Sequence, residues 1–258
     1  MSETAGLRAE VAGDGVATLT IARPEKRNAF TLAMWSALPG MLATLAADPR
    51  VRVLLVTGEG GTFSAGADVT ELLETYADPE RAEAYHRINV LAEEALAAFP
   101  RPTVAVVRGS CVGGGCQLAV ACDLRFAEPG ARFGITPAKL GVVYPAVPTT
   151  RLTRLVGPAR AKYLLYSADL VTAARAASWG LVDEIAEDVH ARAREFGQLL
   201  ASRSPQTLGA VKAVVDAVMI GGDAQAAVDP WEKHSRTGPD VPEGLAAFIE
   251  GRPARFEG

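Results

Sequence analysis

The 258-residue sequence predicts an α/β protein with a mainly parallel sheet, followed by a helical C-terminal part. Two observations support this prediction. Short runs of β-branched residues, typical of strands buried on both faces, alternate with longer amphipathic stretches. From about Pro145 onward the patterns become mostly helical. Because strands that alternate with helices form βαβ units, the strands are expected to run parallel.

Five strands and three helices are expected in the N-terminal part. The dipeptide Asp14-Gly15 favours a tight turn, so the first two strands should form a hairpin. Pro39-Gly40 lies inside the first helical pattern, where proline disturbs the middle turn. The strands are expected at residues 7–12, 16–22, 51–57, 103–107 and 124–127. The helices are expected at residues 31–47, 79–99 and 114–121.

The C-terminal part is predicted to contain five further helices. Pro158 stands at the first position of one of them, where its missing N–H group would have no partner in any case. No linker rich in Ser and Gly separates the two parts, so we expect one cooperative unit. The helices are expected at residues 149–155, 158–167, 172–179, 189–202 and 205–220.

Composition excludes several classes of protein. A hydrophobic content of 49% supports a sizeable core and excludes disorder. A net charge of −4, with both signs interspersed, gives no electrostatic reason to expect a nucleic-acid partner. No stretch of about 18 residues is free of charges and glycine clusters, so no membrane span is expected.

The cysteines and the N-terminal residues predict a cytoplasmic protein. The first residues have neither the basic nor the apolar segment of a signal peptide. The odd number of cysteines, Cys111, Cys116 and Cys122, favours reduced thiols. No histidine lies near them in the sequence and no C-x-x-C pair occurs, so no metal site is expected.

Two loops of small residues follow predicted strands. Residues 63–68 read Phe-Ser-Ala-Gly-Ala-Asp, and residues 109–117 contain the run Gly113-Gly114-Gly115. Small residues let a ligand approach the backbone, and amides at a helix N-terminus favour an anion or a developing oxyanion. An alternative interpretation is that these glycines only allow tight turns and close helix–strand packing. Neither loop fits a nucleotide-binding fingerprint.

Six blocks of sequence resemble the enoyl-CoA hydratase/isomerase (crotonase) superfamily. They occur in the order of that family and extend over nearly the whole chain. The resemblance implies a crotonase-type ββα spiral core over residues 1–198. It also implies a helical oligomerisation region over residues 199–258 and a homotrimer or a hexamer. The blocks are residues 23–30, 63–68, 113–119, 122–124, 151–157 and 243–250.

Members of this family act on acyl-CoA thioesters, and the resemblance assigns roles to particular residues. The backbone N–H groups of Ala67 and Gly114 would hold the thioester oxygen. Two preorganised amides stabilise a thioester enolate where its charge develops, and losing one such donor costs about 10²–10³ in rate. CoA itself is expected as part of the substrate, with no separate cofactor. The implied CoA contacts are around Lys26, Arg27, Ala65, Gly66, Asp68 and Val69.

The basic pair in this set has two interpretations. Lys26 and Arg27 carry charges that suit the phosphates of CoA. The alternative is that both are solvated surface charges beside a turn.

The sequence departs from the family at the two glutamates that its hydratases use. One glutamate ends the pattern G-G-G-C-E and the other lies in F-G-x-P-E, and together they activate water and deliver a proton. Here the two positions are Gln117 and Pro137. Glutamine does not titrate and proline offers no functional group. We therefore expect weak or absent hydration of crotonyl-CoA.

A second pattern suggests a different reaction. Thr136-Pro137-x-x-Leu140-Gly141-Val142-x-Tyr144 is similar to methylmalonyl-CoA decarboxylases of the same superfamily. Decarboxylation needs no base, because the broken carbon–carbon bond supplies the electron pair. The hydroxyls of Thr136 and Tyr144 would bind the departing carboxylate, and Gln117 would orient it. The similarity is partial, since that subgroup has histidine where this chain has Ala67.

Several alternatives stay open at this point. His86, on the predicted helix 79–99, is another candidate acid or base, as are Glu71 and Glu74. The leading expectation is a lyase or isomerase of acyl-CoA thioesters. The alternatives are a decarboxylase of a malonyl- or methylmalonyl-type CoA ester and a non-catalytic acyl-CoA-binding protein.

Overall fold

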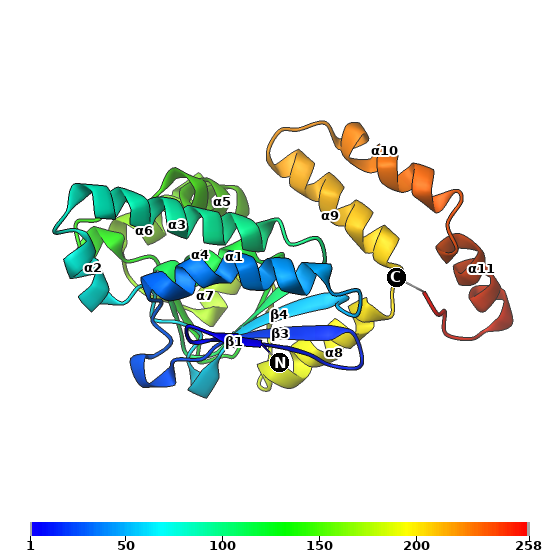
Figure 1. The fold of residues 1–258 in the computed structure, drawn as a ribbon, viewed down its shortest axis with the longest axis horizontal. Coiled ribbons are helices and arrows are strands. Elements are labelled where there is room, and N and C mark those ends of the chain that lie inside the picture. The colour runs from blue at the N-terminus through cyan, green and yellow to red at the C-terminus, as the bar shows by residue number, and fades with distance from the viewer. Residues whose placement is uncertain (1, 257–258) are drawn as a thin grey trace.

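Figure 1 shows the computed structural model, which describes residues 2–256 of the chain. Within these residues a seven-stranded sheet has the order β1-β2-β3-β4-β5-β7-β10, and a smaller sheet has the order β6-β8-β9. The strands of the large sheet are β1 (Ser2–Thr4), β2 (Leu7–Val11), β3 (Val16–Ile21), β4 (Val53–Gly58), β5 (Thr103–Val107), β7 (Leu124–Ala127) and β10 (Glu184–Ile185). The small sheet contains β6 (Ser110–Val112), β8 (Arg132–Gly134) and β9 (Val171–Thr172).

The large sheet confirms both the predicted hairpin and the predicted parallel pairing. β2 and β3 are antiparallel, whereas β3, β4, β5, β7 and β10 pair in parallel along the rest of the sheet. β4 begins two residues later than predicted, at Val53. The reason is that the N–H of Val51 donates to the carbonyl of Asp48 and closes the turn after the first helix.

The predicted helices are confirmed, with ends that differ by no more than three residues. Pro39 lies inside the first helix without ending it. These helices are α1 (Leu32–Ala47), α3 (Pro79–Ala97), α4 (Gly114–Ala121), α5 (Ala146–Val156), α6 (Pro158–Ser167), α7 (Ala173–Ser178), α8 (Val189–Ala201) and α9 (Pro205–Met219). Three helices were not predicted: α2 (Val69–Thr75), α10 (Ala224–Ser235) and α11 (Asp240–Glu250).

The central strands are buried on both faces because helices cover both. All six residues of β4 are buried. Leu54 and Val56 belong to the core under α1, α3 and α4, whereas Val53 and Leu55 belong to a second core under α8. This two-sided burial explains why β4 is a continuous apolar run rather than an alternating one.

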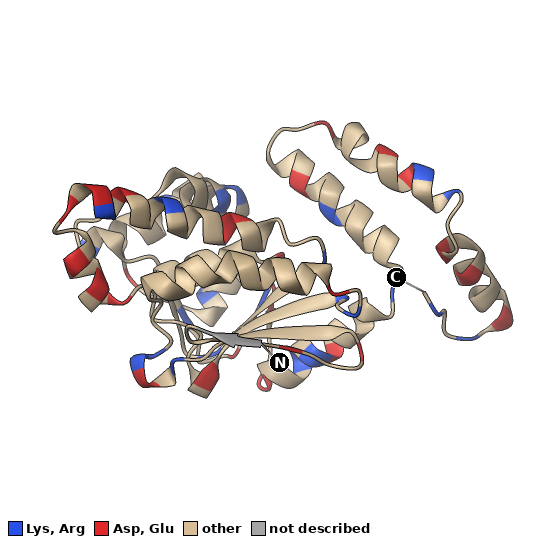
Figure 2. Cartoon of the chain, viewed as in Figure 1, with Lys and Arg blue, Asp and Glu red and all other residues tan. Residues whose placement is uncertain are grey.

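The last three helices form an arm beside the α/β body (Figure 1). Lys212 of α9 ties the arm to the body, because its Nζ lies 2.7 and 2.8 Å from the two carboxylate oxygens of Asp123. Large apolar side chains are exposed on the arm, and Phe248 and Ile249 are 87% and 83% exposed. Charged residues of both signs are spread over the ribbon, while α1 carries none (Figure 2).

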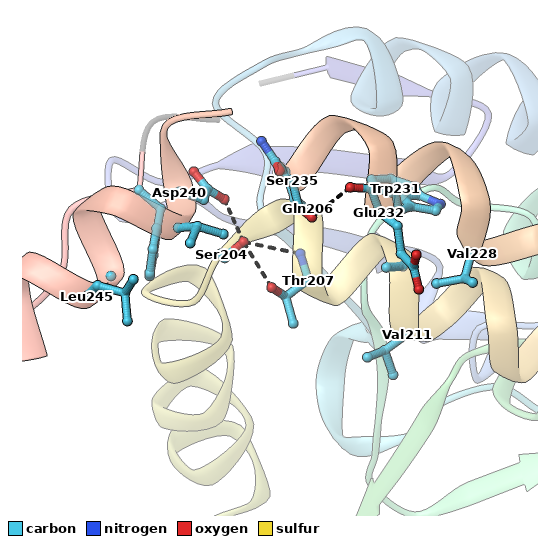
Figure 3. A pocket seen from close by; sticks show the side chains of 14 residues that line it. Ser204, Gln206, Thr207, Val211, Val228, Trp231, Glu232, Ser235, Asp240 and Leu245 are labelled. Atoms are coloured by element: carbon cyan, nitrogen blue, oxygen red, sulfur yellow. Dashed lines mark hydrogen bonds between the residues drawn. The ribbon is translucent and has the colours of Figure 1, made fainter. Parts of the chain in front are cut away.

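A pocket of about 420 Å³ lies among the helices of the arm (Figure 3). Its lining includes Val211 of α9, Trp231 of α10 and Leu245 of α11. The hydroxyl of Ser204 donates to Oδ2 of Asp240 at 2.5 Å and so links the starts of α9 and α11.

Among residues 2–256, no helix combines the length and the apolar character that a membrane span requires. Cys111, Cys116 and Cys122 are buried, and none of them forms a disulfide. Burial raises the pKa of Cys122 to about 12, so its thiol stays protonated and unreactive.

Candidate active site

The two loops of small residues lie side by side. The segment after β4 pairs in parallel with β6 through two hydrogen bonds. Ser64 N–H donates to the carbonyl of Ser110 at 2.9 Å, and Val112 N–H donates to the carbonyl of Ser64 at 3.0 Å. On the other edge of this segment, Phe30 N–H donates to the carbonyl of Gly66 at 2.7 Å. Backbone hydrogen bonds therefore fix the first loop between the second loop on one edge and Phe30 on the other.

This pairing decides where the Ala67 amide points. Asp68 N–H donates to the carbonyl of Phe30 at 2.8 Å, and the Gly66 carbonyl accepts from Phe30. Since successive peptide groups of an extended segment face opposite sides, the N–H of Ala67 faces away from Phe30. Gly114 is the first residue of α4, so its N–H has no acceptor within the helix.

The two amides lie next to each other and are free. A Cβ atom placed on Gly114 would lie 3.9 Å from the nitrogen of Ala67, and both residues line one cavity. Among residues 2–256, neither amide donates to an acceptor of the protein. Two unpaired donors and the positive end of a helix dipole thus meet at one point, which suits a carbonyl oxygen that becomes negative.

Glycine is required at three positions around this point. Gly66 and Gly113 have φ values of +95° and +53°, in the region that side chains disfavour. A Cβ on Gly114 would lie 2.8 Å from the ring of Trp35. Trp35 is fully buried in α1 and lies against the start of α4, a position that no pattern in the sequence indicated.

The cavity has a volume of about 120 Å³, and its described lining contains no aspartate or glutamate. The ionisable lining groups are three tyrosines and one histidine. The lining residues are Ala65, Gly66, Ala67, Val69, Leu72, Tyr76, Tyr85, His86, Asn89, Gly113, Gly114, Gln117, Thr136, Pro137, Leu140, Val142, Tyr144 and Pro145.

The structure brings all five residues with a predicted catalytic role to this cavity. They come from the first loop, from α4 and from the segment before α5, and are Ala67, Gly114, Gln117, Thr136 and Tyr144. Three residues of the predicted CoA set, Ala65, Gly66 and Val69, line the same cavity.

The other three residues of the CoA set lie outside the cavity lining. Lys26 and Arg27 are exposed on the loop between β3 and α1, and the Arg27 carbonyl accepts from Ala65 N–H at 2.9 Å. The carboxylate of Asp68 is 2.7 Å from Arg23 and also caps α2 through Thr70 N–H. The hydrogen bond from Arg23 lowers the pKa of Asp68. With both contacts, this carboxylate connects the first loop to Arg23 and to the start of α2.

Gln117 belongs to a hydrogen-bonded chain that the sequence analysis did not foresee. Its Nε2 donates to Oε2 of Glu93 at 2.7 Å, and its Oε1 accepts from the hydroxyl of Tyr144 at 3.3 Å. The guanidinium of Arg151 donates to Oε1 of Glu93. Glu93 is fully buried and Gln117 is 3% exposed.

A signal for Glu93 was present in the sequence. It lies on the buried stripe of α3, beside Asn89, Ala92 and Leu96. A charged residue at a position that the helical period assigns to the core indicates a buried polar contact. The partner residues, 24 and 58 positions away along the chain, carried no comparable signal.

Two of the hydroxyl groups that line the cavity, those of Tyr144 and Thr136, can donate hydrogen bonds. Burial raises the pKa of Tyr144 well above its ordinary value, so this side chain stays a neutral phenol. Thr136 is half-buried, and its Oγ1 lies 3.9 Å from the position of a Cβ on Gly113. Both hydroxyls therefore lie on the cavity that contains the two free amides.

The alternative acids and bases lie in different places. His86 lines the cavity, and its Nε2 is 2.7 Å from the hydroxyl of Tyr76. The carboxylate of Glu71 accepts from Leu32 N–H at 2.7 Å at the start of α1. Neither Glu71 nor Glu74 is part of the cavity lining.

Comparisons with known proteins agree with this geometry. The family model for enoyl-CoA hydratase/isomerase matches residues 12–258. The crotonyl-CoA hydratase of Syntrophomonas wolfei is 32% identical over 253 residues, covering 93% of this chain and 94% of that protein. The mitochondrial enoyl-CoA hydratase domain-containing protein 2 of Bos taurus is 35% identical over 253 residues, covering 95% of this chain and 85% of that protein.

The fold is also shared with solved structures. The crystal structure of an enoyl-CoA hydratase/carnitine racemase from Magnetospirillum magneticum has a TM-score of 0.93 to this chain. The two sequences are 30% identical, and the match covers 98% of this chain and 96% of the other.

The chain therefore belongs to the enoyl-CoA hydratase/isomerase family, as its sequence blocks predicted. The predicted crotonase-type α/β fold is confirmed. At this level the protein is a crotonase-superfamily enzyme of the acyl-CoA type.

Proposed function

We propose that the protein stabilises the enolate of an acyl-CoA thioester and that it is not a conventional hydratase. One observation carries this proposal: two free amides meet in a cavity whose described lining has no carboxylate. The amides of Ala67 and Gly114 supply the stabilisation of the negative oxygen. The carboxylates that would activate water are replaced by Gln117 and Pro137.

The remaining polar groups favour donation of a proton over its removal. Tyr144 is a neutral phenol, and Gln117 does not titrate. An enolate formed in this cavity would therefore take its proton from Tyr144, which solvent then reprotonates. A lyase that forms the enolate by bond cleavage needs only such a donor, whereas an isomerase also needs a base, for which His86 is the candidate in the cavity lining.

The hydration assay tests this proposal directly. Crotonyl-CoA is mixed with the enzyme, and the loss of the conjugated enoyl thioester absorbance is followed. We expect little turnover by the native chain and a gain in the double variant Gln117→Glu, Pro137→Glu. The matched control is Glu94→Gln, an exposed change on α3 that should leave the rate unchanged. Rapid hydration by the native chain would contradict the proposal.

A second candidate is decarboxylation of a malonyl- or methylmalonyl-type CoA ester. The observation that favours it is the pair of hydroxyls, Thr136 and Tyr144, in a cavity whose described lining holds no competing anion. The bond between the α-carbon and the carboxylate breaks, carbon dioxide leaves, and the electron pair becomes the enolate. The α-carbon then takes a proton from Tyr144.

Release of carbon dioxide from malonyl-CoA and methylmalonyl-CoA tests this candidate. We expect release by the native chain and a loss of at least about tenfold in Tyr144→Phe. No release from either ester would exclude these substrates. Binding of CoA esters by calorimetry without turnover of any ester would instead favour a non-catalytic acyl-CoA-binding protein.

The exposed side chains of the arm support a proposal on assembly, and the buried thiols of the body support one on location. Exposed apolar side chains on α9 and α11, including Val215, Phe248 and Ile249, favour contact with further copies of the chain. We propose a homotrimer or a dimer of trimers, which sedimentation would distinguish from a monomer. The buried free thiols favour a reducing compartment, the cytoplasm.

A further inference from the structure

Tyr85, on α3, has a hydroxyl group whose hydrogen finds no acceptor in the protein. It is one of three tyrosines that line the cavity. The hydroxyl of Tyr76 lies 2.7 Å from Nε2 of His86, and that of Tyr144 donates to Gln117 at 3.3 Å. Tyr85 is only 7% exposed, and among residues 2–256 no atom accepts a hydrogen bond from its hydroxyl. One nearly buried donor on the cavity wall is therefore unused.

The polar groups next to this hydroxyl are donors. The amide of Asn89 directs Nδ2 toward the Tyr85 backbone carbonyl, at 3.2 Å. The Nε1 atom of Trp35 is buried and has no partner in hydrogen-bonding geometry. Burial raises the pKa of Tyr85 to about 12, while the side chains of Asn89 and Trp35 act in the opposite direction. Groups that favour the phenolate direct hydrogens toward its oxygen, so neither of them takes the hydrogen of the hydroxyl.

The unused donor belongs to the same part of the cavity as the two free amides. Atom Cζ2 of Trp35 would lie 2.8 Å from a Cβ on Gly114, and Nε1 is on the same edge of the indole ring. Trp35 therefore lies between the start of α4 and the side chain of Tyr85. A thioester oxygen held by the amides of Ala67 and Gly114 would leave the Tyr85 hydroxyl for the acyl group.

A plain alkyl chain would not satisfy this donor. Such a chain would displace water from the hydroxyl without supplying an acceptor, and a buried donor left unpaired is costly. A site that is built to hydrogen-bond one group of a substrate rejects the analogue that lacks it. An oxygen atom on the acyl group would supply the acceptor. With a volume of about 120 Å³, the cavity suits a short acyl group.

We propose that Tyr85 determines substrate specificity by donating a hydrogen bond to an oxygen atom of the acyl group. The preferred substrates are then short acyl-CoA thioesters that carry a hydroxyl, a carbonyl or a carboxylate in the acyl chain. The proposal rests on the proposed function, in which the acyl group occupies this cavity. Asn89 and Trp35 strengthen the donor, because neighbouring hydrogen-bonding groups polarise one another.

Calorimetric binding of CoA esters with equal acyl length tests the proposal without requiring turnover. The esters are butyryl-CoA, which lacks the extra oxygen, and 3-hydroxybutyryl-, 4-hydroxybutyryl- and succinyl-CoA, which separate a hydroxyl from a carboxylate. We expect at least one of these three to bind at least about tenfold more tightly than butyryl-CoA, and Tyr85→Phe to reduce the preference below about threefold. The matched control Tyr166→Phe removes an exposed hydroxyl on α6 and should keep the preference. Equal affinities in the native chain, or equal losses for all esters in Tyr85→Phe, would overturn the proposal.

An NMR measurement on the native chain serves where Tyr85→Phe does not fold. The chain has three tryptophans, so ¹⁵N-tryptophan labelling gives three indole signals, which Trp179→Phe and Trp231→Phe assign. We expect the Trp35 signal to move more with the preferred ester than with butyryl-CoA, because the new hydrogen bond of Tyr85 repolarises its neighbours. Equal movement would overturn the proposal.

Failure of this proposal and failure of the proposed function have different signatures. Binding of all four esters without a preference would overturn the role of Tyr85 and leave the proposed function standing. A preference that depends on Tyr85, without turnover of any ester, would refute the proposed enolate chemistry and leave the role of Tyr85 standing. Absence of binding by every ester would overturn both.

Discussion

The cavity has two walls of different construction. One wall is backbone: the amides of Ala67 and Gly114, fixed by hydrogen bonds between main-chain atoms of neighbouring segments. The other wall is made of side chains, in which Gln117 and Tyr144 are held by a buried chain that ends at Arg151. We expect substitutions in the side-chain wall to leave the backbone wall in place. Under the proposed function, the backbone wall would stabilise the enolate, and the side-chain wall would determine what becomes of it.

The largest expected effect comes from breaking the backbone wall. In Gly114→Ala the new methyl would meet the ring of Trp35 at 2.8 Å and push the start of α4 away from Ala67. We expect a loss of about 10²–10³ in kcat/KM on any CoA ester that the enzyme converts. The control is Gly40→Ala in α1, where nothing lies within 4 Å and alanine favours the helix. A native rate in Gly114→Ala would refute the role of the amide pair.

A smaller effect is expected from the side-chain wall. Thr136→Val keeps the shape of the side chain and removes its hydroxyl. We expect about a tenfold loss in release of carbon dioxide from a malonyl-type ester, because one hydrogen bond to the departing carboxylate is lost. Thr136→Ser should retain most of the activity. Equal losses in both variants would mean that packing, and not the hydroxyl, matters at this position.

The ion pair between Arg23 and Asp68 supports the loop of the backbone wall, and its loss should change the stability of the fold alone. The hydrogen bond from Arg23 lowers the pKa of Asp68 below its unfolded value of about 3.9. The pair therefore stabilises the fold above about pH 4, and this contribution is lost as the pH falls further. Asp68→Asn should lower the free energy of unfolding by less than about 1 kcal/mol at pH 7. Urea unfolding should show that the deficit shrinks toward pH 3, and a constant deficit would contradict this origin.

The last prediction is that a change of pH between 7 and 9 does not alter the contribution of Tyr144 to activity. Because burial raises the pKa of Tyr144 well above its ordinary value, its hydroxyl stays protonated at pH 9. The ratio of native to Tyr144→Phe activity should therefore stay constant between pH 7 and pH 9. A ratio that falls with rising pH would show that the phenol ionises in this range.

The sequence predicted most of the body and much of the cavity for physical reasons. Apolar runs buried on both faces, as in β4, have a clear pattern. The small-residue loops indicated a region of close backbone approach, and the family resemblance assigned Ala67 and Gly114 within it. Helix α2 was missed because it has only seven residues, and α10 because Pro230 interrupts a largely polar pattern. The contacts of Gln117 with Glu93 and Tyr144 depend on how two helices and a loop pack, which no local pattern reports.

Helix α4 has a consequence for the molecule as a whole. Its first residue bounds the cavity, and Asp123, two residues past its end, holds Lys212 of the arm. The helix is eight residues long, a stiff rod of about 12 Å. This short helix therefore joins the contact that ties the arm to the body with the residue whose amide bounds the cavity.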